Sequence, residues 1–211
     1  MAGDESTLRR CVVFGAAALY WGGVLVQARR VRRRIGRSPN LRPRNLKEMR
    51  LWLGWMLVVT AWLVQPWLLG WRGVPRFLQT SGPLVTRPVL ALGILLMLAG
   101  YAGTLWCYAS LGSAWRIGVD PGEKTVLVIR GPYRVVRHPI YLFQIVMLAA
   151  SALLLPTCLS LAILALHYLC ARSKALDEES HLLKVQGRDY SEYLARTGRF
   201  FPRLFPRPPR P

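Results

Sequence analysis

Four long stretches of the chain contain no Lys, Arg, Asp or Glu, and they separate segments in which charged residues are frequent. An uncharged apolar run of about 18 or more residues predicts a membrane-spanning helix, because about 20 residues at about 1.5 Å rise cross the hydrocarbon layer of about 30 Å. The pattern therefore predicts an all-α integral membrane protein, with residues 1–211 forming a single membrane domain. The four stretches are residues 11–28, 51–71, 88–109 and 139–171.

The last apolar stretch is too long for one span, and Pro156 interrupts it. Proline cannot donate a helical hydrogen bond and tends to end a helix. We therefore expect two short helices, 140–155 and 157–171, that form a hairpin. Each half is about 24 Å long at about 1.5 Å per residue, so the hairpin is expected to dip shallowly into the bilayer or to thin it. The chain is thus predicted to have about five membrane helices.

The first apolar stretch follows Arg9 and Arg10 and therefore has features of a secretory signal. Three further apolar stretches and a dense arginine run follow it, which favours a retained first helix.

The charge balance supports a membrane protein once its distribution is considered. The 211 residues are 53% hydrophobic, yet 29 Lys and Arg against 10 Asp and Glu give a net charge of +19. Because the charges lie outside the apolar stretches, a soluble enzyme, a secreted disulfide scaffold and a disordered basic tail protein are excluded. The cysteines lack CxxC spacing and the histidines lack metal-ligand spacing, so we expect neither a disulfide nor a metal site.

The basic residues also predict the topology. Residues 29–50 contain ten Lys and Arg, residues 110–138 contain five and the chain from 172 onward contains nine, whereas residues 72–87 contain three. Short loops rich in Lys and Arg stay on the cytoplasmic side. We therefore expect the N-terminus outside and the C-terminus in the cytosol, in an inner, plasma or endomembrane.

This topology places two charged segments, 110–139 and 172–203, in one cytosolic compartment, where we expect them to form a cofactor-binding part. Residues 204–211 are expected to be a disordered Pro/Arg tail. The arginine run of residues 29–34 is interpreted as a topology anchor that contacts lipid headgroups. No nucleic acid and no obligate protein partner are expected.

The first candidate cluster spans residues 130–141. Gly131 and Pro132 predict a turn, and Pro139 suits the first position of a helix whose free N–H groups favour an anion. The cluster also contains Arg137 and His138 as donors and Tyr133 and Tyr141 as aromatic faces. It can therefore bind a cofactor that has a carboxylate and a heteroaromatic ring. The alternative is a set of interfacial Arg and Tyr residues that anchor a helix end.

The second cluster follows the last apolar helix. Lys174 and Glu178 are four residues apart and share a helical face. Acidic residues there are by themselves more typical of a solvated face, but their combination with the first cluster favours a site. The second cluster contains Lys174, Asp177, Glu178, Glu179, Gly187, Tyr190, Tyr193, Arg199, Phe200, Phe201 and Pro202.

The ordered combination of these motifs over residues from about 105 to 203 resembles the isoprenylcysteine carboxyl methyltransferases and their bacterial relatives. The resemblance implies a membrane methyltransferase that uses S-adenosylmethionine and receives a lipid-like acceptor from the bilayer. The acceptor group stays open between an isoprenylcysteine-type or other lipidic carboxylate, a phenol, a thiol and an amine. The resemblance implies catalytic roles for Arg137, Lys174 and Glu178, and cofactor binding by Tyr133, His138, Pro139, Tyr141, Glu178 and Glu179.

Two residues depart from the pattern of that family. Lys174 stands where many relatives have Arg, and an ammonium cannot clamp a carboxylate with two parallel hydrogen bonds. Arg172 is an alternative donor for that role. Phe143 stands where relatives usually have Gly, and we expect its ring to narrow or reshape the pocket.

Two other functions remain open. Sterol and steroid reductases that use NADPH have a similar Arg-His motif before a late helix, but the pair of glutamates here favours the methyltransferase. A non-catalytic membrane protein would retain the motifs only for packing, and Gly93, Gly100 and Gly103 suit close helix packing in either case. No GxGxxG motif follows a predicted strand, so a soluble nucleotide-binding fold is not expected.

Overall fold

The computed structural model of the chain describes residues 2–36, 43, 45–71, 73, 75, 84–115, 127–203 and 205. Within these ranges the chain is helical and contains no strand. Four of its helices are long and apolar enough to cross a membrane, and one apolar helix is shorter. The predicted all-α membrane fold is therefore confirmed. The helices are α1 (Ala2–Ile35), α2 (Leu46–Leu68), α3 (Arg87–Leu111), α4 (Pro139–Leu154), α5 (Cys158–Gln186) and α6 (Arg188–Arg196), with 3₁₀ turns η2 (Gly112–Ala114) and η3 (Gly131–Arg134).

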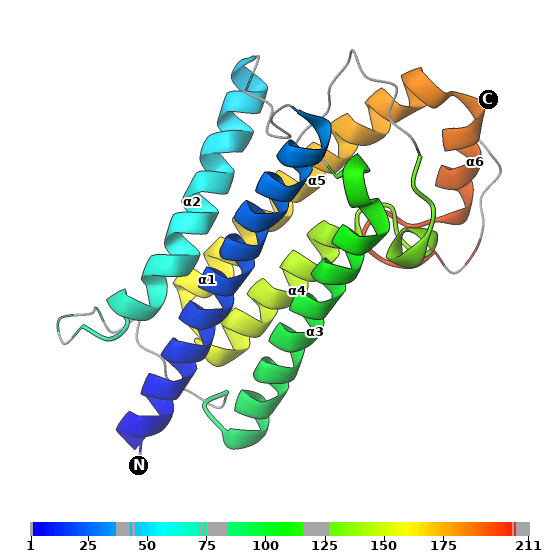
Figure 1. Ribbon diagram of the computed structural model, residues 1–211. Helices are drawn as coiled ribbons and strands as arrows, with labels where there is room; N and C mark the ends of the chain where they lie inside the picture. The colour runs from blue at the N-terminus through cyan, green and yellow to red at the C-terminus, as the bar shows by residue number, and fades with distance from the viewer. Residues whose placement is uncertain are drawn as a thin grey trace.

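Helices α1 to α5 run in alternating directions, so the chain crosses the bundle from end to end (Figure 1). The C-terminal ends of α1, α3 and α5 lie at one end of the bundle, which we call the upper end. The turn η3 and helix α6 lie there too. The described parts of the two segments that were expected to share a compartment are therefore at the same end of the molecule.

Of the last two membrane helices, only α5 differs in length from the prediction. Helix α4 has 16 residues, as the prediction of a helix over 140–155 has, but α5 has 29 residues and continues well past residue 171. The apolar pattern ends at Ala171, yet the following residues include no proline or glycine before Gly187, so the helix continues. Gly187 has φ of 52° and ends the helix. The charged part of α5, from residue 172, thus extends beyond its apolar span.

Helices α3 and α4 pack closely because small residues of α3 face large residues of α4. A Cβ atom added at Gly100 would lie 2.4 Å from Met147 Cγ, and one added at Gly103 would lie 2.3 Å from the Phe143 ring. The expected close-packing role of these glycines is confirmed. The Phe143 ring, which was expected to narrow or reshape the pocket, packs against α3 in the space that Gly103 leaves.

The short helix α4 ends inside the bundle, where a buried arginine caps it. The Arg9 side chain is 1% exposed. Its guanidinium donates to Leu154 O at the end of α4 at 3.4 Å, to Thr86 O at 2.6 Å and to Glu5 Oε1 at 2.9 Å. These bonds satisfy carbonyls that the apolar surroundings cannot, and they fix the lower end of α4.

Candidate functional site

The site begins with η3, which the end of α3 holds in place. Gly131 has φ of 59°, and a Cβ atom there would lie 2.2 Å from Ser110 Oγ. Arg130 Nε donates to the Ser110 carbonyl at 2.9 Å. Only glycine combines this backbone conformation with so close an approach to α3. The turn directs the following residues across the upper end of the bundle.

Two backbone segments about 60 residues apart pair beside η3. Val136 and Gly198 form an isolated parallel bridge. Arg137 N donates to Gly198 O at 2.9 Å, and His138 N donates to Arg199 O at 3.1 Å. This pairing brings the His138 and Arg199 side chains to the same place.

Helix α6 secures this arrangement from the other side. Tyr193 on α6 donates its hydroxyl to the Tyr133 carbonyl in η3 at 2.6 Å. Arg137 Nη1 reaches Thr197 O, just after the end of α6. The turn, α6 and the segment after it therefore form one hydrogen-bonded unit.

Glu179 is the centre of a buried ion-pair cluster. One of its oxygens, Oε1, lies 3.0 Å from Arg137 Nε, 3.0 Å from Arg199 Nε and 3.3 Å from His138 Nε2. The other, Oε2, accepts from Arg199 Nη2 at 2.7 Å. Glu179 is 7% exposed. Burial alone would raise its pKa, but hydrogen bonds from His138 and Arg199 and the charge of Arg137 hold the pKa well below its ordinary value.

His138 lies between two carboxylates. Its Nδ1 is 3.3 Å from Glu178 Oε2, and its Nε2 is 3.3 Å from Glu179 Oε1. Burial would lower the pKa of His138, but hydrogen bonds to Glu178 and Glu179 and their negative charges raise it above the ordinary value. Because both ring nitrogens face acceptors, the protonated imidazolium satisfies the site best.

Glu178 differs from Glu179 in its surroundings. Its Oε1 accepts a hydrogen bond from Tyr141 at 3.1 Å, and its side chain is 21% exposed, against 9% for Glu179. The Tyr141 ring stacks on His138 with centroids 5.7 Å apart and planes 14° apart. Glu178 is therefore the carboxylate of the cluster that a ligand can reach.

A cavity of about 210 Å³ borders the cluster. Phe200 lines it and also lies with its ring centroid 6.2 Å from His138 and 6.0 Å from Tyr168. Arg199 lines it while holding Glu179. The cavity thus combines cationic and aromatic groups at the edge of the ion-pair cluster. Its lining residues are Tyr168, Arg172, Arg199, Phe200 and Phe201.

Most of the site residues suggested by the sequence come together. Pro139 begins α4 as expected, and Tyr133 is buried in η3. Lys174 is half-buried on α5, one turn before Glu178, and does not line the cavity, whereas Arg172 does. The cluster contains Arg137, His138, Tyr141, Glu178 and Glu179.

Arg199 and Phe200 belong to the site, although the sequence motifs did not assign them a role in it. Both were visible in the second cluster, after the tyrosines of α6, but the pairing of two short irregular segments has no periodic signal in a sequence. Among the described residues, no group of three or more His, Cys, Asp or Glu side chains can hold a metal ion.

Comparisons with known proteins match a family over part of the chain. Residues 88–189 match the family described as phospholipid methyltransferase, and this segment contains α3, η3, α4 and α5. The match covers slightly less than half of the chain and supports the resemblance to membrane methyltransferases.

Two metal-resistance proteins are also similar. The nickel-cobalt-cadmium resistance protein NccN of Alcaligenes xylosoxydans xylosoxydans is 29% identical over 126 residues, which are 60% of this chain and 55% of that protein. The cobalt-zinc-cadmium resistance protein CzcN of Cupriavidus metallidurans is 27% identical over 143 residues, 64% of this chain and 62% of that protein. The matches thus span little more than half the length of these relatives.

Proposed function

We propose that this chain, whose residues 88–189 match the phospholipid methyltransferase family, uses S-adenosylmethionine to methylate a lipid-like acceptor. The family supports a membrane methyltransferase, while the cofactor and the acceptor are the proposal. The observation that carries it is His138 held between Glu178 and Glu179 beside a cavity with two arginines and three aromatic rings.

The residues present fit this cofactor. S-adenosylmethionine has a carboxylate, cationic ammonium and sulfonium groups, and an adenine ring. Arg172 offers its guanidinium group to a carboxylate, and Arg199 retains Nη1 beyond its two bonds to Glu179. Glu178 offers a partly exposed carboxylate to a cation. Tyr168 and Phe200 offer aromatic faces to the ring and to a cation. When bound, the cofactor supplies a methyl group on a positively charged sulfur.

The chain's own residues chiefly hold this arrangement in place. Glu179 contacts His138, Arg137 and Arg199, so it positions the imidazole and the guanidinium groups. Arg137 is 9% exposed and bound to Glu179, so we assign it a positioning role instead of the catalytic role that the resemblance implied. Transfer of a methyl group is an in-line displacement that depends mainly on the alignment of two reactants. Fixed side chains on α5 and the 198–200 segment serve that alignment.

The acceptor is proposed to arrive from the bilayer. Tyr168 is 40% exposed and Phe201 is 66% exposed, and both line the cavity, so an apolar molecule can approach it along α5. The acceptor group is a carboxylate, phenol, thiol or amine on such a lipid. Arg172 is the cation that we propose to meet an acidic acceptor, and Lys174 takes this role only if its ammonium reaches the cavity beside Glu178.

Equilibrium binding of labelled S-adenosylmethionine to the purified full chain in lipid nanodiscs tests the proposal. We expect saturable binding that weakens by about tenfold or more in Glu178→Gln and in His138→Ala, because each loses a charge-assisted contact. Glu192→Gln is the matched control, since Glu192 is a carboxylate on α6 that pairs with Arg188 outside the cluster.

Normal binding in both cluster variants would overturn the site, and no binding by the unmodified chain would overturn the cofactor. Displacement of bound NADPH, but not of S-adenosylmethionine, would support the reductase instead. Incubation of enriched membranes with the methyl-labelled cofactor then identifies the acceptor from the lipid or protein that becomes labelled.

A further inference from the structure

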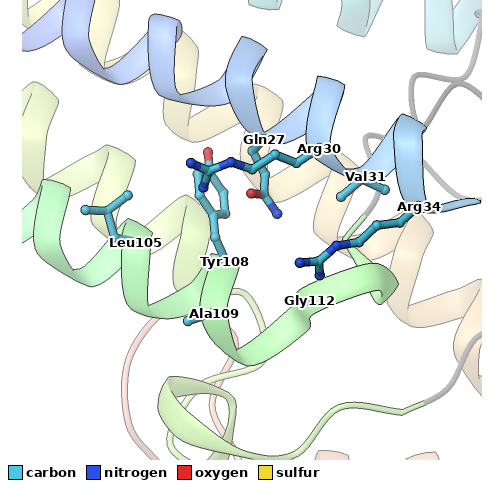
Figure 2. Close-up of a pocket in the computed structure, with 8 residues that line it drawn as sticks. All are labelled: Gln27, Arg30, Val31, Arg34, Leu105, Tyr108, Ala109 and Gly112. Carbon is cyan, nitrogen blue, oxygen red and sulfur yellow. The ribbon is translucent and has the colours of Figure 1, made fainter.

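A second cavity, of about 360 Å³, lies between α1 and α3 at the upper end of the bundle (Figure 2). None of its lining residues belongs to the ion-pair cluster or to the cavity beside it. Four come from the last turns of α1 and four from the end of α3 and the turn after it. They are Gln27, Arg30, Val31, Arg34, Leu105, Tyr108, Ala109 and Gly112.

This cavity is basic. Arg30 and Arg34 are four residues apart on α1, and both guanidinium groups lie in the space between α1 and α3 (Figure 2). None of the eight lining residues is acidic, and neither arginine has an ion-pair partner among the residues that the structure describes. The C-terminal end of α3 contributes a partial negative charge of only about one half. Two full positive charges outweigh it, so the cavity attracts an anion.

The wall of this cavity is also apolar on its membrane side. Leu105 lines it and is 46% exposed. Val26, one turn before Arg30 on α1, is 45% exposed. In a membrane-spanning chain such residues face lipid tails. The basic groups therefore lie just above lipid-facing residues, at the depth of lipid headgroups.

We propose that the cavity between α1 and α3 binds the phosphate-bearing headgroup of an anionic phospholipid. Arg30 and Arg34 hold the phosphate, and the acyl chains lie along Leu105 and the lipid-facing residues of α1. Guanidinium groups bind phosphate with paired, charge-assisted hydrogen bonds, and basic pockets between membrane helices recognise such headgroups. A free phosphate ion would use the arginines but not the apolar wall. This site does not depend on the proposed methyl transfer.

Photocrosslinking of the full chain in vesicles tests this site. The vesicles contain phosphatidylcholine with a minor fraction of phosphatidylglycerol that carries a photoreactive acyl chain. We expect crosslinks within residues 25–34 and 105–112, and competition by unlabelled phosphatidylglycerol but not by added phosphatidylcholine. Arg30→Gln/Arg34→Gln is expected to reduce these crosslinks by about tenfold.

The basic run itself offers the matched control. Arg29→Gln/Arg33→Gln removes the same charge from the same segment, but those side chains do not line the cavity, so crosslinking is expected to stay near that of the unmodified chain. Equal losses in both double variants would overturn the site and leave only a general attraction between the arginine run and the membrane. Equal labelling by a photoreactive phosphatidylcholine would overturn it too.

Two further measurements distinguish a bound lipid from free phosphate and from misfolding of a variant. Loss of the crosslinks on addition of millimolar inorganic phosphate, without loss on addition of equimolar sodium chloride, would overturn the lipid as the occupant in favour of free phosphate. Thermal unfolding of both double variants checks that they are folded. The competition between phosphatidylglycerol and phosphatidylcholine on the unmodified chain tests the proposal even if a variant does not fold.

Discussion

His138 lies between the carboxylates of two adjacent residues on another helix. Adjacent helical residues point about 100° apart, yet Glu178 and Glu179 reach Nδ1 and Nε2 of the same ring. Glu178 also accepts a hydrogen bond from Tyr141, and Glu179 also binds Arg137 and Arg199. The histidine therefore joins a partly exposed acid to a buried one, and its charge affects both.

The protonation of His138 predicts a pH dependence of stability. Its pKa is raised in the folded protein, so its contribution is complete below the ordinary value of 6.5 and is lost as the pH rises through the folded value. The pKa of Glu179 is lowered, so its contribution is present above the ordinary value of 4.5 and is lost only as the pH falls through the lowered value. Of these two groups, only His138 changes its contribution to stability above pH 6.5.

We therefore expect the unmodified chain to be more stable than His138→Gln near pH 6, and this difference to shrink toward pH 9. Thermal unfolding in detergent over this range measures it. Glu192→Gln, on the exposed face of α6, serves as the control and is expected to show no such trend. A stability difference that is constant over the range would contradict a charged His138 in the cluster.

At this scale the sequence identified the titratable residues of the site but not all of their partners. The histidine and the two glutamates were found through an ordered set of motifs. Arg199 was not assigned, because it reaches Glu179 only through the pairing of Val136 with Gly198. The packing of Phe143 was not predicted, because a sequence does not show that Gly103 on another helix makes room for its ring.

The close packing of α3 against α4 depends on small residues. The α3 glycines permit the close approach of α4, whose N-terminal end carries His138 and Tyr141. Apolar patterns predicted these helices, but they did not predict how far α5 continues. The charged part of α5 carries Glu178 and Glu179, and it belongs to the same continuous helix as the apolar span.

Substitution of Gly103 by Ala is expected to destabilise the chain by about 1–3 kcal/mol, because the new Cβ overlaps the Phe143 ring. Thermal unfolding measures the change. Gly22→Ala is the matched control, since nothing lies within 4 Å of a Cβ there, and it is expected to be neutral or slightly stabilising. Adding Phe143→Leu to Gly103→Ala should restore part of the loss. Equal effects of the two glycine substitutions would argue against close packing at Gly103.

Over the whole molecule, the alternation of five helices places every part of the candidate site at the upper end. The charge distribution of the sequence predicted this common location, and the structure agrees with it. The direction in which the bundle lies in the membrane stays a prediction from the positive-inside rule.

Labelling with a membrane-impermeant thiol reagent measures this direction. In a chain with its four cysteines replaced by Ala, we expect a cysteine at Asp4 to react in intact cells, and cysteines at Arg33 or Arg188 to react only after lysis. Reaction of Arg33→Cys and Arg188→Cys from opposite sides would contradict the alternation. Reaction of both in intact cells, with Asp4→Cys protected, would reverse the orientation.

The pairing of Val136 with Gly198 also separates the parts of the chain that form the bundle from the parts that complete the site. A chain that ended after Gln186 would still contain all five bundle helices, so its apolar part can insert without the last residues. Such a chain contains His138, Glu178 and Glu179 but lacks Arg199 and Phe200, and the backbone N–H groups of Arg137 and His138 lose their acceptors. Truncation before Gly198 is therefore expected to yield an inserted bundle without an assembled site.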